Sequence, residues 1–268
     1  MTKKKEGAIK MKYSLCADIM FVGVGEKGPV WPDTDGIIEA MKLAKKNGLT
    51  GIEMFDLQGR DLARIAEASK ELGIEVRACV SAGAPFLGNP EKTDELVSMF
   101  TESIPKAKQI GCDKLILNAA EYAKDLSEQE VLKAMEDALK KLAPIAEKEG
   151  VTVLVEPLTD GFFTSSKQAF GLIESVGSEN VKLLYDIFHF QNIEGKITET
   201  IKNNLKWIGD IHGAGAPMRA ELTVGELDYL FILNTIKDLG YDGNFCLEFF
   251  TFQDREAKVK ASCTVLPE

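Results

Sequence analysis

The sequence predicts a single-domain (β/α)8 barrel, and three observations lead to this fold class. Short apolar runs alternate eight times with segments of helical periodicity, as expected when a helix follows each strand. The runs are continuously apolar, which is typical of parallel strands buried on both faces. A length of 268 residues suits one barrel of about 250 residues. No linker or low-complexity tract divides the chain, so we expect one domain over residues 1–268.

Eight apolar runs are the predicted strands, and they span residues 13–21, 51–55, 75–80, 114–118, 152–157, 181–186, 207–212 and 244–249. The predicted helices span residues 33–47, 61–72, 92–110, 127–149, 165–176, 196–203 and 225–239. Glycines follow several of these segments, which favours helix ends there. After the last strand, residues 251–268 predict only a weak eighth helix. A partner subunit of a homo-oligomer could cover that seam.

The composition argues against several classes of partner. The chain has 32 Lys and Arg against 42 Asp and Glu, a formal net charge of −10. Nucleic acid is therefore not expected, because phosphate binding needs a concentrated basic surface. No segment reaches the roughly 18 apolar residues of a membrane span, and the amino terminus lacks a signal-peptide pattern. Five scattered cysteines without a C-x-x-C pair favour free thiols in a reducing, cytoplasmic location.

Acidic and imidazole side chains stand near the ends of the predicted strands. The carboxyl ends of the strands build the active site in a barrel of this kind. The candidates are Glu53, Glu121, Glu156, Asp186, His189, His212 and Glu248. A single carboxylate at a strand end is as readily a helix cap or a surface group, so the roles of Glu53 and Glu121 stay open.

Four candidates on consecutive strands predict one metal site: Glu156, Asp186, His212 and Glu248. Each ends an apolar run, where an unpaired carboxylate is costly to desolvate. Three carboxylates repel one another, and Arg219 alone cannot neutralise them. One divalent cation can, and this ligand set suits Mn²⁺ or Mg²⁺, with Co²⁺ or Zn²⁺ as alternatives. A metal that holds a carbonyl and its neighbouring hydroxyl would let a carboxylate move the carbon-bound proton.

Several segments resemble the hydroxypyruvate isomerase branch of the xylose isomerase-like TIM barrels, which also include tagatose and allulose 3-epimerases. They read VEPL followed by GFF, NVKLLYDIFHFQNIEGKI, IGDIHGAGAPMRAELTVGELDY and GYDGNFCLEFF. The likeness follows element order over residues 13–250 and is most specific after residue 151. Its strongest matches are D-x-x-H at Asp186 and His189, and R-x-E at Arg219 and Glu221.

The resemblance implies one set of metal ligands, namely Glu156, Asp186, His212 and Glu248. It also implies that Glu156 and Glu248 move the proton, while His189 and Arg219 hold substrate oxygens. Histidine at position 212 departs from the isomerase branch, which commonly has glutamine there, and is more like the 3-epimerases. The substrate therefore stays open between these two groups.

The first choice of function is a metal-dependent aldose-ketose isomerase that interconverts hydroxypyruvate and tartronate semialdehyde. Arg219 motivates it, because a guanidinium beyond His212 could pair with a carboxylate, with Glu221 and His189 holding the guanidinium and a substrate oxygen. The alternative is a ketose 3-epimerase of the tagatose or allulose type. An abasic-DNA endonuclease is disfavoured by the charge of −10 and by only two histidines, since a multi-zinc site needs more nitrogen ligands. A non-catalytic binding module is disfavoured because both candidate proton-transfer glutamates are present.

Overall fold

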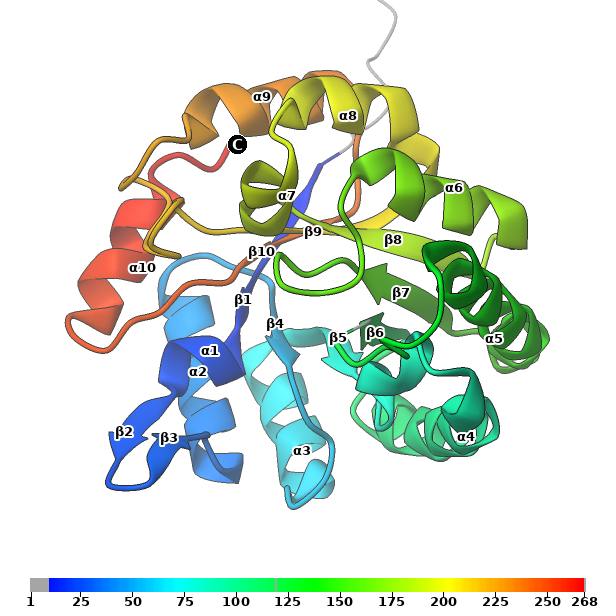
Figure 1. Cartoon of the computed structure of the whole chain (residues 1–268). Helices are drawn as coiled ribbons and strands as arrows, with labels where there is room; N and C mark the ends of the chain where they lie inside the picture. Colours follow the sequence, from blue (N-terminus) through cyan, green and yellow to red (C-terminus); the bar gives the residue numbers. More distant parts are fainter. Residues whose placement is uncertain (1–9, 119, 268) are drawn as a thin grey trace, which may run out of the picture.

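Within residues 10–118 and 120–267, which this computed structural model describes, eight strands close into a barrel. Their order is β1-β10-β9-β8-β7-β6-β5-β4, and every neighbouring pair is parallel (Figure 1). The strands are β1 (Lys12–Cys16), β4 (Gly51–Met54), β5 (Glu75–Val80), β6 (Lys114–Asn118), β7 (Thr152–Glu156), β8 (Val181–Asp186), β9 (Ile208–Gly213) and β10 (Asn244–Leu247). The predicted (β/α)8 fold class is confirmed.

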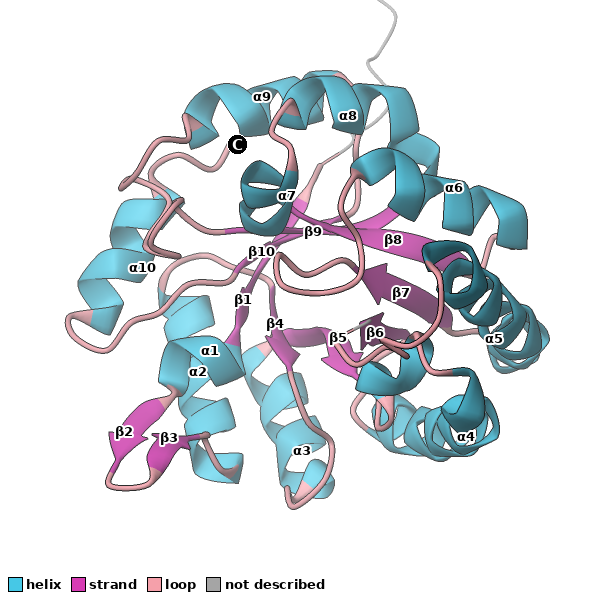
Figure 2. Ribbon diagram, viewed as in Figure 1, coloured by secondary structure: helices cyan, strands magenta, loops and turns pink. Residues whose placement is uncertain are grey.

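Helices surround the barrel (Figure 2). The longer ones are α2 (Thr34–Lys46), α3 (Leu62–Leu72), α4 (Thr93–Gln109), α5 (Glu128–Glu149), α6 (Ser166–Val176) and α9 (Tyr229–Asp238). The shorter ones are α1 (Ala17–Phe21), α7 (Ile187–Ile193), α8 (Ile197–Asn204) and α10 (Arg255–Cys263), with 3-10 turns at Ala84–Leu87, Pro90–Lys92 and Leu205–Trp207. A small antiparallel hairpin is formed by β2 (Gly23–Gly25) and β3 (Gly28–Val30).

Local signals in the sequence explain how the long helix α5 is bounded. Ser127 and Glu130 form the predicted capping box, in which each side chain bonds the backbone N–H of the other residue and satisfies a donor that the first turn leaves free. Gly150 ends the helix in the left-handed conformation, with φ of 63°, which costs glycine little. Between these ends, one apolar face packs onto the barrel, so the helix has a fixed place beside β7.

The first predicted strand, residues 13–21, is wrong in its second half. β1 ends at Cys16, and the chain continues as the buried helix α1. An apolar run without clear period suits a buried strand and a buried helix equally well. The helix α7 was missed for the same reason, because its FHF sequence continues the apolar run of β8.

The interior of the barrel is divided into an apolar and a polar half. The apolar half takes one residue from each of four adjacent strands: Ala78, Ile116, Leu154 and Leu184. The polar half takes one buried residue from each of the other four: Ser14, Glu53, Asp210 and Asn244. Most barrels of this class fill the whole interior with branched apolar side chains. The polar half therefore needs an explanation of its own.

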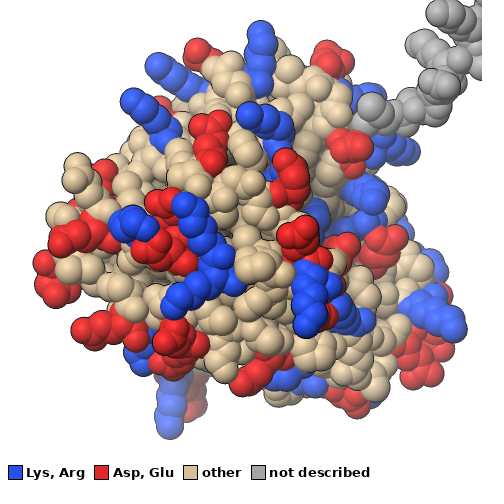
Figure 3. Space-filling view, turned by 90° about the vertical axis from the view of Figure 1, so that its right-hand side faces the viewer, with Lys and Arg blue, Asp and Glu red and all other residues tan. Residues whose placement is uncertain are grey.

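Acidic and basic side chains are interspersed over the face shown in Figure 3. Across residues 10–118 and 120–267, no helix is both long and apolar enough to pass through a membrane. Residues 1–9, on which the absence of a signal-peptide pattern partly rests, lie outside the described residues.

The weak eighth helix that we expected is α10, which is short but docked. Val259 on it is fully buried. Ser262 accepts a hydrogen bond from the Leu222 N–H at 3.1 Å. On its other side, Arg255 Nε donates to the Met20 carbonyl at 2.8 Å. The helix thus ties α1 to the segment that follows β9.

We predict that Val259→Ala lowers the free energy of unfolding by about 2 kcal/mol, because a fully buried valine side chain contributes about that much. Urea unfolding followed by circular dichroism measures it. Lys260→Ala, on the exposed side of the same helix, is the control and should change stability little. Equal, small effects of the two substitutions would mean that α10 is not packed in solution.

Candidate active site

The four predicted ligand residues converge at the carboxyl ends of four adjacent strands. Glu156 and Asp186 are the last residues of β7 and β8, His212 lies in β9, and Glu248 directly follows β10. Asp186 and His212 are register partners. All four are buried, and one ligand atom from each lies within 4.8 Å of the others.

The His212 ring lies between two carboxylates. Its Nδ1 is 2.8 Å from Glu248 Oε2, and its Nε2 is 2.9 Å from Glu53 Oε2. Glu53, whose role was open in the sequence, is therefore part of the site's surroundings. Glu121, the other open candidate, is exposed and lies outside this group.

Arg219 reaches the same carboxylates from the loop after β9. Its Nη2 donates to Glu248 Oε2 at 2.7 Å and to Asp186 Oδ2 at 3.2 Å, and its guanidinium stacks over the Phe188 ring at 4.9 Å. The side chain is only 13% exposed. Its Nε is buried and has no hydrogen-bond partner among the described residues. This donor is enclosed by protein and unpaired, so the hydrogen-bonding capacity of the guanidinium is not fully satisfied.

The loop that carries Arg219 is folded tightly upon itself. Gly215 and Ala220 exchange backbone hydrogen bonds of 2.7 and 3.0 Å. A Cβ added at Gly215 would lie 2.0 Å from the Val224 carbonyl oxygen, so no other residue fits there. Arg219 itself has a left-handed backbone, with φ of 51°, and its carbonyl accepts from the Phe250 N–H at 3.1 Å. These contacts aim the guanidinium at the strand ends.

The expected contact of Glu221 with Arg219 is wrong. Glu221 lies 3.6 Å from Lys258 of α10, whereas Arg219 turns inward to the carboxylates of Asp186 and Glu248. The two residues are close in sequence, but the tight loop sends their side chains in different directions. Sequence spacing alone could not reveal that fold of the loop.

His189 faces Arg219 with the other nitrogen of its ring held by the backbone. The Thr159 N–H donates to His189 Nδ1 at 3.0 Å, which leaves the proton of a neutral ring on Nε2. Burial lowers the pKa of His189 and favours this neutral form. Its Nε2 is 3.0 Å from Arg219 Nη1, so two donors face each other. An acceptor oxygen beside them would satisfy both.

The electrostatics of the site shift the pKa values of Glu156 and Glu248 in opposite directions. Burial, reinforced by the neighbouring Glu248 carboxylate, raises the pKa of Glu156 to about 8. Burial also acts on Glu248, but Arg219 and His212 outweigh it and hold its pKa well below the ordinary value. Burial disfavours charge on His212, yet Glu53 and Glu248 raise its pKa well above the usual range. A pair of carboxyl groups with separated pKa values is the usual arrangement for acid and base roles.

The donor set fits one small divalent cation. Ligand atoms about 2.0 to 2.3 Å from a single ion lie about 3 to 4.5 Å from each other, which agrees with the spread of up to 4.8 Å among these four residues. Three carboxylates and one imidazole are also the donors that such cations take. Glu53, His212 and Cys246 form a second close group, but it uses the opposite nitrogen of the same ring.

A cavity of about 1040 Å³ opens above these residues. Glu156, His189, Arg219 and Glu248 line it together with aromatic side chains, namely Trp31, Phe55, Phe188 and Phe250. Arg219 is the one arginine or lysine among the described residues that line this cavity. The cavity can therefore hold a polar ligand with an anionic group at one end.

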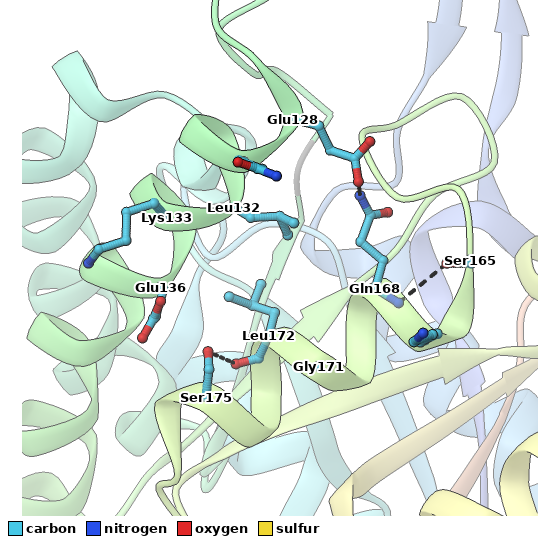
Figure 4. A pocket seen from close by; sticks show the side chains of 11 residues that line it. Glu128, Leu132, Lys133, Glu136, Ser165, Gln168, Gly171, Leu172 and Ser175 are labelled. Atoms are coloured by element: carbon cyan, nitrogen blue, oxygen red, sulfur yellow. Dashed lines mark hydrogen bonds between the residues drawn. The ribbon is translucent and has the colours of Figure 1, made fainter.

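A second hollow, of about 550 Å³, lies on the outer wall between α5 and α6 (Figure 4). Its rim is polar, and Gln168 donates to Glu128 at 2.9 Å. It is lined by the surface side chains of two helices and contains no histidine or cysteine. We assign the chemistry to the strand ends.

Comparison with known proteins identifies the family and agrees with the fold. The family model for the xylose isomerase-like TIM barrel matches residues 41–268. A hydroxypyruvate isomerase homologue of Drosophila melanogaster is 28% identical over 223 residues, covering 77% of this chain and 83% of the relative. L-ribulose 3-epimerase of Mesorhizobium japonicum is 25% identical over 202 residues, covering 71% of this chain and 67% of the relative. The solved structure of the IOLI protein with a zinc atom matches with a TM-score of 0.73 at 20% identity, covering 95% of each chain.

We predict that Arg219→Met lowers the free energy of unfolding by about 3 kcal/mol when no divalent cation is added, because it leaves buried carboxylates uncompensated. Thermal and urea unfolding in chelator-treated buffer measure the change. Arg64→Met is the matched control, since Arg64 pairs with Asp35 on the exposed surface, where ion pairs contribute little. A change as small as that of the control would show that Arg219 does not compensate the site.

Proposed function

Because the chain belongs to the xylose isomerase-like TIM barrel family, we propose that it is a metal-dependent isomerase acting on a short 2-keto, 3-hydroxy acid. The proposed pair is hydroxypyruvate and tartronate semialdehyde. Its relatives are named as isomerases and epimerases, and the chain is an enzyme of this class. Arg219 carries the choice of an acid, because it is the one arginine or lysine among the described residues that line the cavity.

The proposed metal ligands are Glu156, Asp186, His212 and Glu248, whose donor set and spacing support a divalent cation. Mn²⁺ or Mg²⁺ suits the oxygen-rich set best. Zn²⁺ and Co²⁺ are alternatives on their ligand preferences, and the IOLI protein structure holds a zinc atom. When bound, such a cation would make the proton next to a chelated carbonyl more acidic.

The two glutamates are the proposed proton carriers. In the metal-free site, Glu248 is ionised because Arg219 and His212 outweigh its burial, whereas burial raises the pKa of Glu156 to about 8, so that Glu156 can hold a proton there. A proton taken from the hydroxyl-bearing carbon and returned to the neighbouring carbon, with the hydroxyl proton transferred to the former carbonyl oxygen, moves the carbonyl by one position. This transfer converts the ketone of hydroxypyruvate into the aldehyde of tartronate semialdehyde.

His189 and Arg219 are the proposed substrate-binding residues. Their facing donors, His189 Nε2 and Arg219 Nη1, are 3.0 Å apart and would both be satisfied by a substrate oxygen. A cation on Asp186 and Glu248 would also compensate the carboxylates that Arg219 now pairs with. The planar guanidinium would then be available to bind a carboxylate with two parallel hydrogen bonds.

A ketose 3-epimerase is the second candidate. Two observations favour it: the cavity of about 1040 Å³ with aromatic walls exceeds the needs of a three-carbon acid, and position 212 is histidine. The same glutamates would then return the proton to the opposite face of the same carbon.

We predict that Glu248→Gln keeps measurable metal binding and loses about 10² to 10⁴ in turnover, because an amide keeps an oxygen ligand but cannot accept a proton. Metal analysis and steady-state kinetics on the same sample test it. Glu121→Gln, at an exposed position, is the control and should behave like the parent.

The parent should lose turnover on chelation and regain it with Mn²⁺ or Mg²⁺. Full activity of the chelated parent would refute the metal requirement. A metal-loaded Glu248→Gln variant with parental turnover would remove Glu248 from the proton transfer.

We predict that Arg219→Lys raises the KM for hydroxypyruvate about tenfold or more, because lysine keeps the charge but loses the planar fork. Assays with hydroxypyruvate, and separately with fructose, tagatose and allulose, measure it. Epimerisation of a neutral ketohexose by the parent, without turnover of hydroxypyruvate, would replace the isomerase with the 3-epimerase.

A further inference from the structure

A chain of buried polar groups crosses the polar half of the barrel and ends at His212. Lys114 Nζ is 2.9 Å from Asp210 Oδ2, and Asn244 Nδ2 donates to Asp210 Oδ1 at 3.0 Å. The same Asn244 amino group donates to Glu53 Oε1 at 2.7 Å. Glu53 Oε2 then meets His212 Nε2 at 2.9 Å. Burying so many polar groups is costly unless they are paired, and of these five side chains only Asn244 has a buried polar atom, Oδ1, without a partner among the described residues.

The contacts of Glu53 fix which of its oxygens faces the histidine. Oε1 accepts hydrogen bonds from Asn244 and, at 3.2 Å, from the Ser14 hydroxyl. Oε2 is left for the His212 ring. A carboxylate oxygen can only accept at this contact, so the ring nitrogen Nε2 must carry its proton there.

The other ring nitrogen of His212 points the opposite way. Nδ1 is 2.8 Å from Glu248 and 3.9 Å from Glu156 Oε1, on the side where the carboxylates gather. Neutral imidazole has one donor and one acceptor nitrogen. Without a cation, Nδ1 also carries a proton, which it donates to the Glu248 carboxylate. A bound cation would displace that proton, while Glu53 keeps the proton on Nε2, so the Nδ1 lone pair would then face the metal.

We infer that Glu53 is a positioning residue, which holds His212 by its Nε2–H so that Nδ1 is presented to the metal bound by Glu156, Asp186 and Glu248. This inference rests on the proposed metal centre. Partners that hold the second nitrogen of a metal-binding histidine typically change metal affinity about 10- to 100-fold when removed. Asn244 acts one step further back, because it holds Glu53 in turn.

The substitution Glu53→Gln tests the role without changing the size of the side chain. Asn244 donates to one end of this side chain, so the new amide should place its oxygen there and its NH₂ group toward His212. Nε2 would then have to accept a hydrogen bond, and the ring proton would move to Nδ1. Nδ1 would no longer offer a lone pair to the metal.

The experiment uses the full-length protein without a histidine tag. Calorimetric titration with Zn²⁺ gives affinity and stoichiometry, and ¹⁵N spectra of the zinc-loaded protein identify which ring nitrogen of His212 carries the proton. Only two histidines contribute to these spectra, and His189→Gln assigns them. We expect one zinc ion and an Nε2–H ring in the parent, and zinc binding about 10- to 100-fold weaker in Glu53→Gln.

Asp18→Asn is the matched control. Asp18 is another buried carboxylate paired with a cation, Arg60, but no hydrogen bond or ion pair between it and His212 is found among the described residues. It should lose stability while keeping the zinc affinity of the parent. Equal losses of affinity in the two variants would indicate a general effect of stability and would overturn the inference.

Four further outcomes distinguish a failure of the inference from a failure of the metal centre. Equal zinc affinity in the parent and in a folded Glu53→Gln variant would refute the role of Glu53 and leave the centre intact. A proton on His212 Nδ1 in the zinc-loaded parent would refute the role of Glu53 without any variant. Two zinc ions per chain, with the second lost in Glu53→Gln, would also refute it, because Glu53 would then be a metal ligand together with Cys246. A parent that binds no divalent cation would refute the centre and the inference together.

Discussion

Compensation of buried negative charge is the constraint on which the site depends. Glu156, Asp186 and Glu248 stand at neighbouring strand ends where water is largely excluded, so each needs a cationic or protonated partner nearby. His212 and Arg219 supply positive charge, and Glu156 responds with a raised pKa. The groups that balance the site are thus the groups that we propose for its chemistry. A guanidinium that pairs with ligand carboxylates and lines the cavity can exchange one anionic partner for another.

Barrel closure brings these groups together from distant parts of the chain. The parallel register sets Asp186 beside His212. Around the barrel, β9 is followed by β10, then β1, then β4. That ring of hydrogen bonds places Glu53, which is 159 residues before His212, against the back of the imidazole. The two nitrogens of the His212 ring therefore connect the strand-end site with the polar half of the barrel interior.

The candidate site could largely be predicted from the sequence because each of its four principal residues ends or follows an apolar run. The role of Glu53 could not be predicted from the sequence, since it depends on a contact with His212 across the closed barrel. The predicted contact between Glu221 and Arg219 was wrong because a tight loop decides where Arg219 points. Residues 17–21 were assigned to a strand because an unbroken apolar run does not distinguish a buried strand from a buried helix.

The position of β10 has a consequence for the newly made chain. It carries Asn244, leads directly into Glu248, and closes the barrel by pairing with β1, yet it is the last of the eight barrel strands in chain order. Until β10 is in place, Glu53 lacks the partner that is 191 residues away in sequence, and the ligand set lacks one carboxylate. A nascent chain that stops short of β10 would hold an open sheet edge and an incomplete set of donors. The proposed cation site therefore becomes complete only when β10 is in place between β9 and β1.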